Sequence, residues 1–481
     1  MKRLFLIVFF HALFISYCQA QHYVLYGLTA FGGSNSMGTL FKYDPVTLKE
    51  TVVYNFDGSH GSYPDNSLIQ ASNGLLYGLA EGGGKYNTGV VFSYDISTGK
   101  ETDLVDFDTL NGSPYHGAEN LFQAKDNNLY GMTWSGGKYN DGVIFRYDII
   151  AKKDSVVYNF DSIHGKYAGE GFVQDTLSGL LFGFTQEGGN YNKGVMFSFD
   201  PIAFIEKVVI DFNDSDGAFP LTTLYQAPGR LLYGMTEGGG DSDQGVLFRY
   251  NIATGNDTVL VKFDDTNGQH PLGNYLIKAS DGLLYGITYE GGTKYPAGGL
   301  GTLFSYNPNT DIEKVLVKLN TNVGGFPLGA LVQDPDDGRL YGLAPQDGGV
   351  NDGLIFRYDI TTGQDTVLLH FNGTNGETPY GSLLLVKDTL TGINEIAAKN
   401  ESISVYPNPS KGVFNFSITN YNQETRNNIE VYNVLGEKVS QVAVSNSQFT
   451  INLVNEPSGI YLFRIISENG SLVASGKLIV E

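Results

Sequence analysis

One pattern recurs seven times between Tyr26 and Phe371, and it constrains the fold more than any other feature of this chain of 481 residues. Each copy has an aromatic-Gly pair, a Gly-Gly loop, a segment close to Gly-x-x-Phe-x-Tyr-Asp and an apolar run. The aromatic-Gly pairs begin at Tyr26, Tyr77, Tyr130, Phe182, Tyr233, Tyr285 and Tyr341. A fixed period of roughly fifty residues is typical of propellers and solenoids, whose units cannot bury their apolar faces alone.

Turn signals divide each repeat into four short runs that are rich in β-branched and aromatic residues. In the second copy the runs are Ser67–Ala71, Leu75–Gly78, Val90–Tyr94 and Thr102–Phe107, and Asn73-Gly74 separates the first two. Asn-Gly between two apolar runs is a strong hairpin signal. Four strands in each repeat, with no helical period, predict the blade of a β-propeller.

The two ends of the repeat region are complementary. Tyr23–Leu28 has the pattern of the second strand of a blade, with no first strand before it. After the seventh repeat one unpaired run remains, Ser382–Val386, which has the pattern of the missing strand. We therefore predict that Leu383–Val386 pairs with Tyr23–Leu28 and closes a seven-bladed β-propeller over residues 21–388.

Residues 1–20 have the pattern of a secretory signal peptide. Lys2 and Arg3 precede the apolar stretch Leu4–Ile15, and cleavage is expected between Ala20 and Gln21. The apolar stretch is too short to span a membrane, and no later segment is long enough. The single cysteine lies within this signal, so the mature chain holds no disulfide and must be stabilised by a large core.

The charge balance argues against two classes of partner. The chain has 51 acidic and 30 basic residues, a formal net charge of −21. A protein this acidic is repelled by nucleic acids and by anionic membrane surfaces, so we expect neither as a partner.

The repeats and the C-terminal segment each resemble a known family. The Leu-Tyr-Gly…Gly-Gly…Tyr-Asp signature is kelch-like and resembles the bacterial GloVer tandem repeats more closely; the resemblance implies an exported protein and brings no established catalytic residues. After a polar linker at 389–401, residues 402–481 resemble the type A sorting domain of the type IX secretion system. The motif that carries this resemblance consists of Tyr406, Pro407, Asn408, Pro409 and Gly412.

The sorting-domain resemblance implies the structure, a partner and the destination of the protein. It implies a small immunoglobulin-like β-sandwich that the type IX translocon reads. We therefore expect a protein that is secreted or attached to the outer cell surface.

Aromatic residues recur in loops that must share one face of the propeller. Tyr86, Tyr139, Tyr191 and Tyr295 lie in the Gly-Gly loops, while Trp134 and Tyr289 share a turn in the third and sixth repeats. Aromatic faces beside Asn, Asp and Gly suit sugar rings. The alternative, which the regular recurrence favours, is that these rings pack the loops together.

Acidic residues recur just before the glycines of the same loops: Glu81, Glu187, Glu237, Glu290 and Asp347. Converging carboxylates would hold Ca²⁺, but no EF-hand-like loop is present, and solvated acids on a rim are the simpler interpretation. We therefore expect no metal or other cofactor, with Ca²⁺ as the alternative.

No Ser/His/Asp set, phosphate loop or Cys/His cluster identifies a reaction. Our first hypothesis is a non-enzymatic binding propeller with extracellular glycans, or else surface proteins, as partners. A polysaccharide-active or other hydrolytic propeller enzyme and a structural adhesin remain as alternatives. An enzyme should break the sevenfold pattern at one place, whereas a lectin should repeat its sites.

Overall fold

The computed structural model describes residues 22–114, 120–273, 276–292, 299–320, 324–346, 352–388, 403–418, 427–433, 438–444, 446–467 and 472–481. The predicted signal peptide, its cleavage site at Ala20–Gln21 and the predicted linker at 389–401 lie outside these ranges. The chain divides into two compact units, Met1–Asp388 and Thr389–Glu481. Every regular element in the described ranges is a β-strand, which confirms the all-β prediction. No helix in those ranges is long and apolar enough to cross a membrane.

The described part of the first unit forms seven four-stranded antiparallel sheets. The first contains β28 (Leu384–Asp388), β1 (His22–Thr29), β2 (Thr39–Asp44) and β3 (Lys49–Asn55). The second sheet contains β4 (Ile69–Gln70), β5 (Leu76–Ala80), β6 (Val90–Asp95) and β7 (Lys100–Asp106). The third contains β8 (Phe122–Gln123), β9 (Leu129–Met132), β10 (Val143–Asp148) and β11 (Lys153–Asn159). The fourth contains β12 (Lys166–Gln174), β13 (Leu181–Glu187), β14 (Val195–Asp200) and β15 (Ile205–Asp211). The fifth contains β16 (Tyr225–Ala227), β17 (Leu231–Thr236), β18 (Val246–Asn251) and β19 (Asn256–Lys262). The sixth contains β20 (Ile277–Lys278), β21 (Leu284–Thr288), β22 (Thr302–Asn307) and β23 (Ile312–Lys318). The seventh contains β24 (Val332–Gln333), β25 (Leu340–Ala344), β26 (Leu354–Asp359) and β27 (Gln364–His370).

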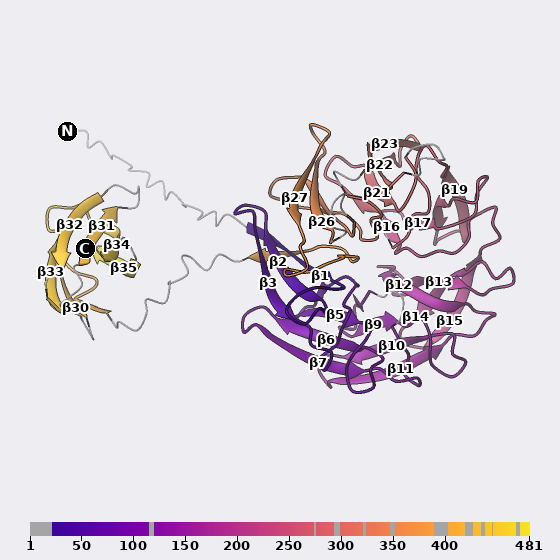
Figure 1. The fold of residues 1–481 in the computed structure, drawn as a ribbon, viewed down its shortest axis with the longest axis horizontal. Coiled ribbons are helices and arrows are strands. Elements are labelled where there is room, and N and C mark those ends of the chain that lie inside the picture. The colour runs from indigo at the N-terminus through magenta and orange to yellow at the C-terminus, as the bar shows by residue number, and fades with distance from the viewer. Residues whose placement is uncertain are drawn as a thin grey trace, which may run out of the picture. The chain divides into compact units, whose positions relative to one another are not determined.

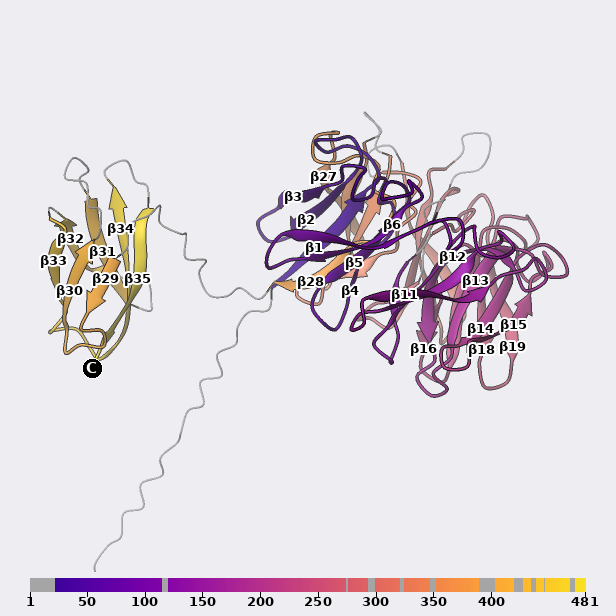
Figure 2. The same ribbon diagram turned by 90° about the horizontal axis from the view of Figure 1, so that it is seen from below.

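The sheets close into a ring through the predicted pairing of the two ends. β28 pairs antiparallel with β1, from Tyr26 opposite Leu384 to His22 opposite Asp388, so this prediction is confirmed (Figure 2). Apolar clusters fill the space between neighbouring sheets, and one of them joins Phe41 of the first sheet to Tyr341 of the seventh. The first unit is therefore a β-propeller, with its sheets arranged around a central axis (Figure 1).

The aromatic-Gly pair is explained by close packing inside each sheet. A Cβ added to Gly27 would lie 2.4 Å from the ring of Phe41, and one added to Gly131 would lie 2.4 Å from the ring of Phe145. Only glycine leaves room for the phenylalanine of the neighbouring strand. The repeated Gly and the repeated Phe therefore recur together because they pack against each other.

Hydrogen bonds between successive blades tie the inner strands together near the axis. The backbone N–H groups of Ser67, Gly171, Ala330 and Ser382 donate to side-chain oxygens of the next blade: Asn120 (3.0 Å), Thr223 (3.1 Å), Ser382 (2.7 Å) and Ser67 (2.9 Å). The bonds that involve Ser382 join the closing segment to both of its neighbours. The axis is therefore held by contacts between residues more than 300 positions apart as well as by local ones.

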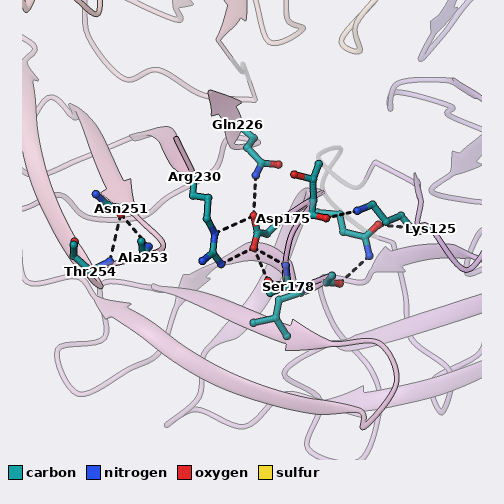
Figure 3. Close-up of polar contacts among 12 residues, drawn as sticks. Lys125, Asp175, Ser178, Gln226, Arg230, Asn251, Ala253 and Thr254 are labelled. Carbon is teal, nitrogen blue, oxygen red and sulfur yellow. Dashed lines mark hydrogen bonds and ion pairs between the residues drawn. The ribbon is translucent and has the colours of Figure 1, made fainter. Parts of the chain in front are cut away.

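A buried ion pair joins the fourth and fifth blades (Figure 3). The fully buried Asp175 accepts hydrogen bonds from Arg230 at 2.6 Å, from Gln226 at 3.2 Å and from Ser178. These donors hold the pKa of Asp175 well below its usual range. Because each oxygen of this carboxylate has a donor, Asp175 stabilises the seam between the two blades.

Other acids in the seams are short of donors. Glu101 accepts a hydrogen bond from Tyr54 of the preceding blade at 3.2 Å, and Glu206 accepts one from Tyr158 at 3.0 Å. Burial raises the pKa of Glu101 to about 8 and that of Glu206 to about 7. Ionisation of these groups therefore opposes folding near neutral pH.

The described part of the second unit is a two-sheet sandwich. One sheet contains β29 (Ile403–Tyr406), β30 (Val413–Ile418) and β33 (Gln448–Asn452); the other contains β32 (Lys438–Val444), β31 (Asn427–Asn433), β34 (Gly459–Ser467) and β35 (Leu472–Val480). Phe414 and Phe416 of the first sheet pack with Ile429 and Ile465 of the second in one core. In the predicted sorting motif, Asn408 donates to the Lys477 carbonyl at 2.7 Å and accepts from the Ile479 N–H at 2.9 Å, while Tyr406 is exposed.

Ring closure predicts the effect of two truncations. Ending the chain after Ser382 should lower the stability of the propeller, because Leu383 and Val386 are buried and each contributes about 1.5–3 kcal/mol. Ending it after Asp388 should leave the melting temperature of the propeller unchanged. Equal melting temperatures for the two truncated proteins would contradict the role of β28.

The raised pKa of Glu206 predicts how stability depends on pH. The folded pKa lies above the ordinary value of 4.5, so this group favours the folded state fully only below pH 4.5 and loses that contribution as the pH rises to about 7. Glu206→Gln removes this loss. The melting temperature of the variant relative to the parent should therefore rise between pH 4.5 and pH 7 and then level off; a difference that is independent of pH would refute the assignment.

Candidate functional site

The predicted loop tyrosines are exposed and lie on separate blades. Tyr86, Tyr139 and Tyr191 are 49%, 50% and 59% exposed and lie in the loops that follow β5, β9 and β13. The ammonium groups of Lys85 and Lys138 each lie 4.7 Å from the ring centre of the tyrosine that follows. In the described ranges no ring contact joins any two of these tyrosines, and Tyr295 lies outside those ranges.

Trp134 and Tyr289 each pack on an aromatic residue of the following connector, which lies between one blade and the next. The Trp134 ring stacks on Tyr167, with centroids 4.9 Å apart and planes within 8°, and Tyr289 contacts Phe326 at 5.1 Å. Trp134 and Tyr289 are half-buried. One face of Trp134 is thus already occupied, which supports the packing interpretation for that ring.

The loop acids fall at two neighbouring positions of the repeat. Glu81 and Glu237 lie four residues after the aromatic of the aromatic-Gly pair, at the position of Trp134 and Tyr289, whereas Glu187 and Glu290 lie one residue later. At the first of these positions the seven repeats carry six different residue types: Ala30, Glu81, Trp134, Gln186, Glu237, Tyr289 and Pro345. The repeat pattern is therefore broken at one position of an otherwise uniform loop.

The start of the inner strand breaks the pattern in the same way. Leu68 and Leu383 are equivalent, because each contacts the glycine of its own blade's aromatic-Gly pair, and Asp65 and Tyr380 lie three residues before them. Thr378 and Tyr63 each lie five residues before these leucines and have the same left-handed backbone, with φ of 56° and 55°. Tyr380 therefore occupies the position that Asp65 has in the second blade.

Four of these residues act on one another near the axis. Burial raises the pKa of Tyr380, and the charges of Tyr289, Asp65 and Glu81 raise it further. The chain next to Tyr380 packs against the chain next to Asp65, since a Cβ added to Gly381 would lie 2.2 Å from the Asn66 carbonyl oxygen. Asp65 and Glu81 belong to the second blade and Tyr289 to the sixth, whereas Tyr380 precedes the closing strand. Residues of these blades can approach one another only near the axis. We call Asp65, Glu81, Tyr289 and Tyr380 the axial mouth.

Asp65 and Glu81 form a hydrogen-bonded carboxyl pair. Asp65 is 8% exposed, and burial together with the charge of Glu81 raises its pKa well above the usual range. Two carboxylates in contact cannot both ionise easily, so the pair shares a proton.

A second buried acid lies among the inner strands. Glu170 is 1% exposed, and its Oε2 atom accepts hydrogen bonds from Asn120 at 3.3 Å and Thr223 at 3.5 Å. Its φ of 64° is in the left-handed region, which is uncommon for a residue with a long side chain. Burial raises its pKa well above the usual range. Buried, strained acids of this kind concentrate at functional sites.

The predicted rim acids do not form a metal site in the described ranges. There, no three His, Cys, Asp or Glu side chains lie close enough together to hold a metal ion, and Asp347 lies outside those ranges. Glu187 instead pairs with Lys166 at 2.8 Å, and Glu237 lies beside His270 and Gln186. The Ca²⁺ alternative gains no support from this geometry.

Comparison with known proteins identifies the repeats. The Gloeobacter/Verrucomicrobia repeat matches residues 15–179, 170–320 and 293–406. The chain belongs to this repeat family. The secretion-system C-terminal sorting domain matches residues 404–481, which confirms the type IX sorting prediction and indicates secretion and attachment to the outer cell surface.

One solved structure with a TM-score above 0.5 supports the fold of these repeats. A candidate 6-phosphogluconolactonase from Bacteroides fragilis is 17% identical to this chain and superposes with a TM-score of 0.51. The match covers 76% of this chain and 98% of the lactonase chain. A second, from Bacteroides uniformis, is 16% identical, covers 76% of this chain and 99% of its own, and has a TM-score of 0.49. At this level of identity the likeness concerns the fold alone. None of the curated proteins matches this chain.

The shared proton predicts that a substitution in the axial mouth stabilises the protein. Because the folded pKa of Asp65 is raised, its contribution to stability is lost as the pH rises above the unfolded value of about 3.9. Asp65→Asn removes that loss, so its melting temperature should exceed that of the parent at pH 8, by a larger margin than at pH 5. A variant that is less stable than the parent at pH 8 would show that Asp65 is ionised and satisfied in the fold.

Proposed function

We propose that this secreted Gloeobacter/Verrucomicrobia repeat protein binds an extracellular glycan at the axial mouth. The observation that carries the proposal is that the charges of Asp65, Glu81 and Tyr289 act on Tyr380, although these residues come from three blades and depart from the repeat, and that Gly381 packs against Asn66 beside them. Residues that serve only the blade recur in each copy, as the Gly27–Phe41 contact does. The departures are concentrated where the blades meet, and this is where propellers offer a shared surface.

The chemistry of the axial mouth suits a hydroxyl-rich ligand. The carboxyl pair offers both a donor and acceptors, and the phenol groups of Tyr289 and Tyr380 offer further hydrogen bonds. Aromatic rings also provide apolar faces for the C–H groups of a sugar ring. Polar groups beside aromatic faces are the usual composition of a small-ligand site.

The carboxyl geometry does not favour glycoside hydrolysis. The two acids of a glycosidase stand about 5–9.5 Å apart across the scissile bond. Asp65 and Glu81 hydrogen-bond to each other and are therefore closer than that. We favour binding over the enzymatic alternative for this reason, and over a purely structural adhesin because the axial residues differ between repeats.

A matched pair of variants tests the site. Tyr289→Ala should weaken glycan binding about thirtyfold, since a stacked ring contributes roughly 1 kcal/mol and a lost phenol hydrogen bond a similar amount. Tyr191→Ala removes an exposed loop tyrosine outside the axial mouth and should leave the affinity unchanged. Both proteins would be measured on a glycan array and then by calorimetry. Loss of binding in Tyr191→Ala alone would place the site on the outer loops.

A further inference from the structure

Glu170 departs from the repeat at a fixed position of the inner strand. The residues that contact the glycine of their own blade's aromatic-Gly pair include Leu68, Phe172, Leu224, Leu331 and Leu383. Two residues before them lie Asn66, Glu170, Thr222, Gly329 and Gly381. Among these five residues only Glu170 is ionisable, so its carboxyl group serves something other than the blade.

The backbone around Glu170 is also irregular. β12 has nine residues, whereas β4, β8, β16, β20 and β24 have two or three. The register between β12 and β13 shifts between Gly169 and Val173, so the segment from Glu170 to Phe172 forms a bulge. A bulge redirects a side chain away from the regular ladder, and it coincides here with the left-handed φ of 64° at Glu170.

The bulge lies between the third and fifth blades and contacts both. A Cβ added to Gly171 would lie 3.3 Å from the Cβ of Asn120 and 3.4 Å from the Oγ1 of Thr223. The Glu170 Oε2 atom accepts hydrogen bonds from the side chains of the same two residues, at 3.3 Å and 3.5 Å. The Asn120 N–H donates to the Glu170 carbonyl at 3.2 Å, and the Gly171 N–H donates to Thr223 Oγ1 at 3.1 Å. Glu170 therefore joins three blades.

These contacts belong to a chain of hydrogen bonds around the axis, which we call the axial girdle. In it Ala330 donates to Ser382, Ser382 to Ser67, Ser67 to Asn120 and Asn120 to Glu170. Thr223 donates to Glu170 from the opposite direction. Glu170 is therefore the acceptor at which the two ends of the axial girdle meet.

The surroundings of Glu170 favour its protonated form. Its side chain is 1% exposed, and its Oε1 atom has no hydrogen-bond partner in the described ranges. Its two Oε2 partners, Asn120 and Thr223, are uncharged. An ionised carboxylate that is buried without a cation is so unfavourable that the group binds a proton instead, and burial accordingly raises the pKa of Glu170 well above its usual range.

The charged groups on neighbouring strands do not alter this conclusion. Tyr130 of β9 and Tyr225 of β16 are not bases, and Glu187 of β13 is an acid. Lys166, at the start of β12, pairs with Glu187 at 2.8 Å. The titratable groups of these strands therefore offer Glu170 no free cation.

Asp175 shows what the same blade supplies to a buried acid that is ionised. It too is fully buried, but Arg230 lies 2.6 Å from one of its oxygens and donors reach both oxygens. Two buried acids of one blade are thus stabilised in different charge states.

We propose that Glu170 is a proton-operated latch of the axial girdle: with its proton bound it holds the third, fourth and fifth blades together, and loss of the proton opens this part of the axis to water. When the carboxyl O–H bond breaks, the proton passes to solvent and Oε1 becomes charged. A charged Oε1 needs donors that the closed fold does not supply, so the bulge must move until water reaches it. The latch does not depend on what binds at the axial mouth.

Hydrogen exchange of the full secreted protein tests the latch. The protection factors of the Asn120 and Gly171 amides should fall by up to about tenfold for each pH unit above 4.5, because opening then releases one proton. The Ala330 and Ser382 amides donate within the axial girdle but away from Glu170, so their protection factors should not follow this dependence. An equal dependence at all four amides would overturn the proposal.

Two variants provide the matched comparison. Glu170→Gln keeps an acceptor for Asn120 and Thr223 and has no proton to lose, so the protection of its Gly171 amide should be independent of pH. Asp175→Asn removes the ionised acid of the same blade; it should lower the melting temperature by a constant amount between pH 5 and pH 9 and keep the pH dependence at Gly171. A pH dependence that persists in Glu170→Gln would assign the proton to another group and overturn the latch.

Infrared spectra give a second readout. The spectrum of the parent minus that of Glu170→Gln at pH 7 should contain the carbonyl stretch of one protonated carboxyl group. A difference spectrum with only carboxylate bands would show that Glu170 is ionised and would contradict the proposal. Failure of Glu170→Gln to fold would contradict it as well, because an amide closely replaces a protonated carboxyl group.

Discussion

The pairing of β28 with β1 is the constraint on which the rest of the propeller depends. Leu384–Asp388 completes the first sheet from the far end of the repeats, and Ser382 hydrogen-bonds to blades on both sides. Without this closure the repeats would form an open array with exposed edges. Closure also brings Tyr380 beside residues of the second and sixth blades, so the axial mouth exists only in the closed ring.

Much of the fold was predictable because the determining contacts recur. The glycine of the aromatic-Gly pair and the Phe of the next strand make the same contact in each repeat, so the repeat period predicts the sheets. The unpaired run after the seventh repeat predicts that the ring closes. The axial mouth was not predictable in this way. Asp65 and Glu81 meet only in three dimensions. Comparing the repeats position by position would have found the departures from the pattern, but not that they converge.

Some buried acids of the propeller lower its stability, because burial disfavours their charged form. Asp175 lies between blades with donors to both oxygens, whereas one oxygen of Glu170 has no hydrogen-bond partner in the described ranges and Asp65 shares a proton with Glu81. A fold that needed only to hold together would favour the arrangement at Asp175. The regular seams between blades supply the stability that offsets this cost.

The position of a bound ligand is the most direct test of the axial mouth as the binding site. A crystal structure of the secreted protein with the glycan it binds best should show one ligand on the axis, with polar atoms within hydrogen-bond distance of Asp65 and Glu81 and a sugar ring against Tyr289 or Tyr380. Ligands bound at the outer Gly-Gly loops, one beside each of Tyr86, Tyr139 and Tyr191, with the axial mouth filled by water, would contradict it.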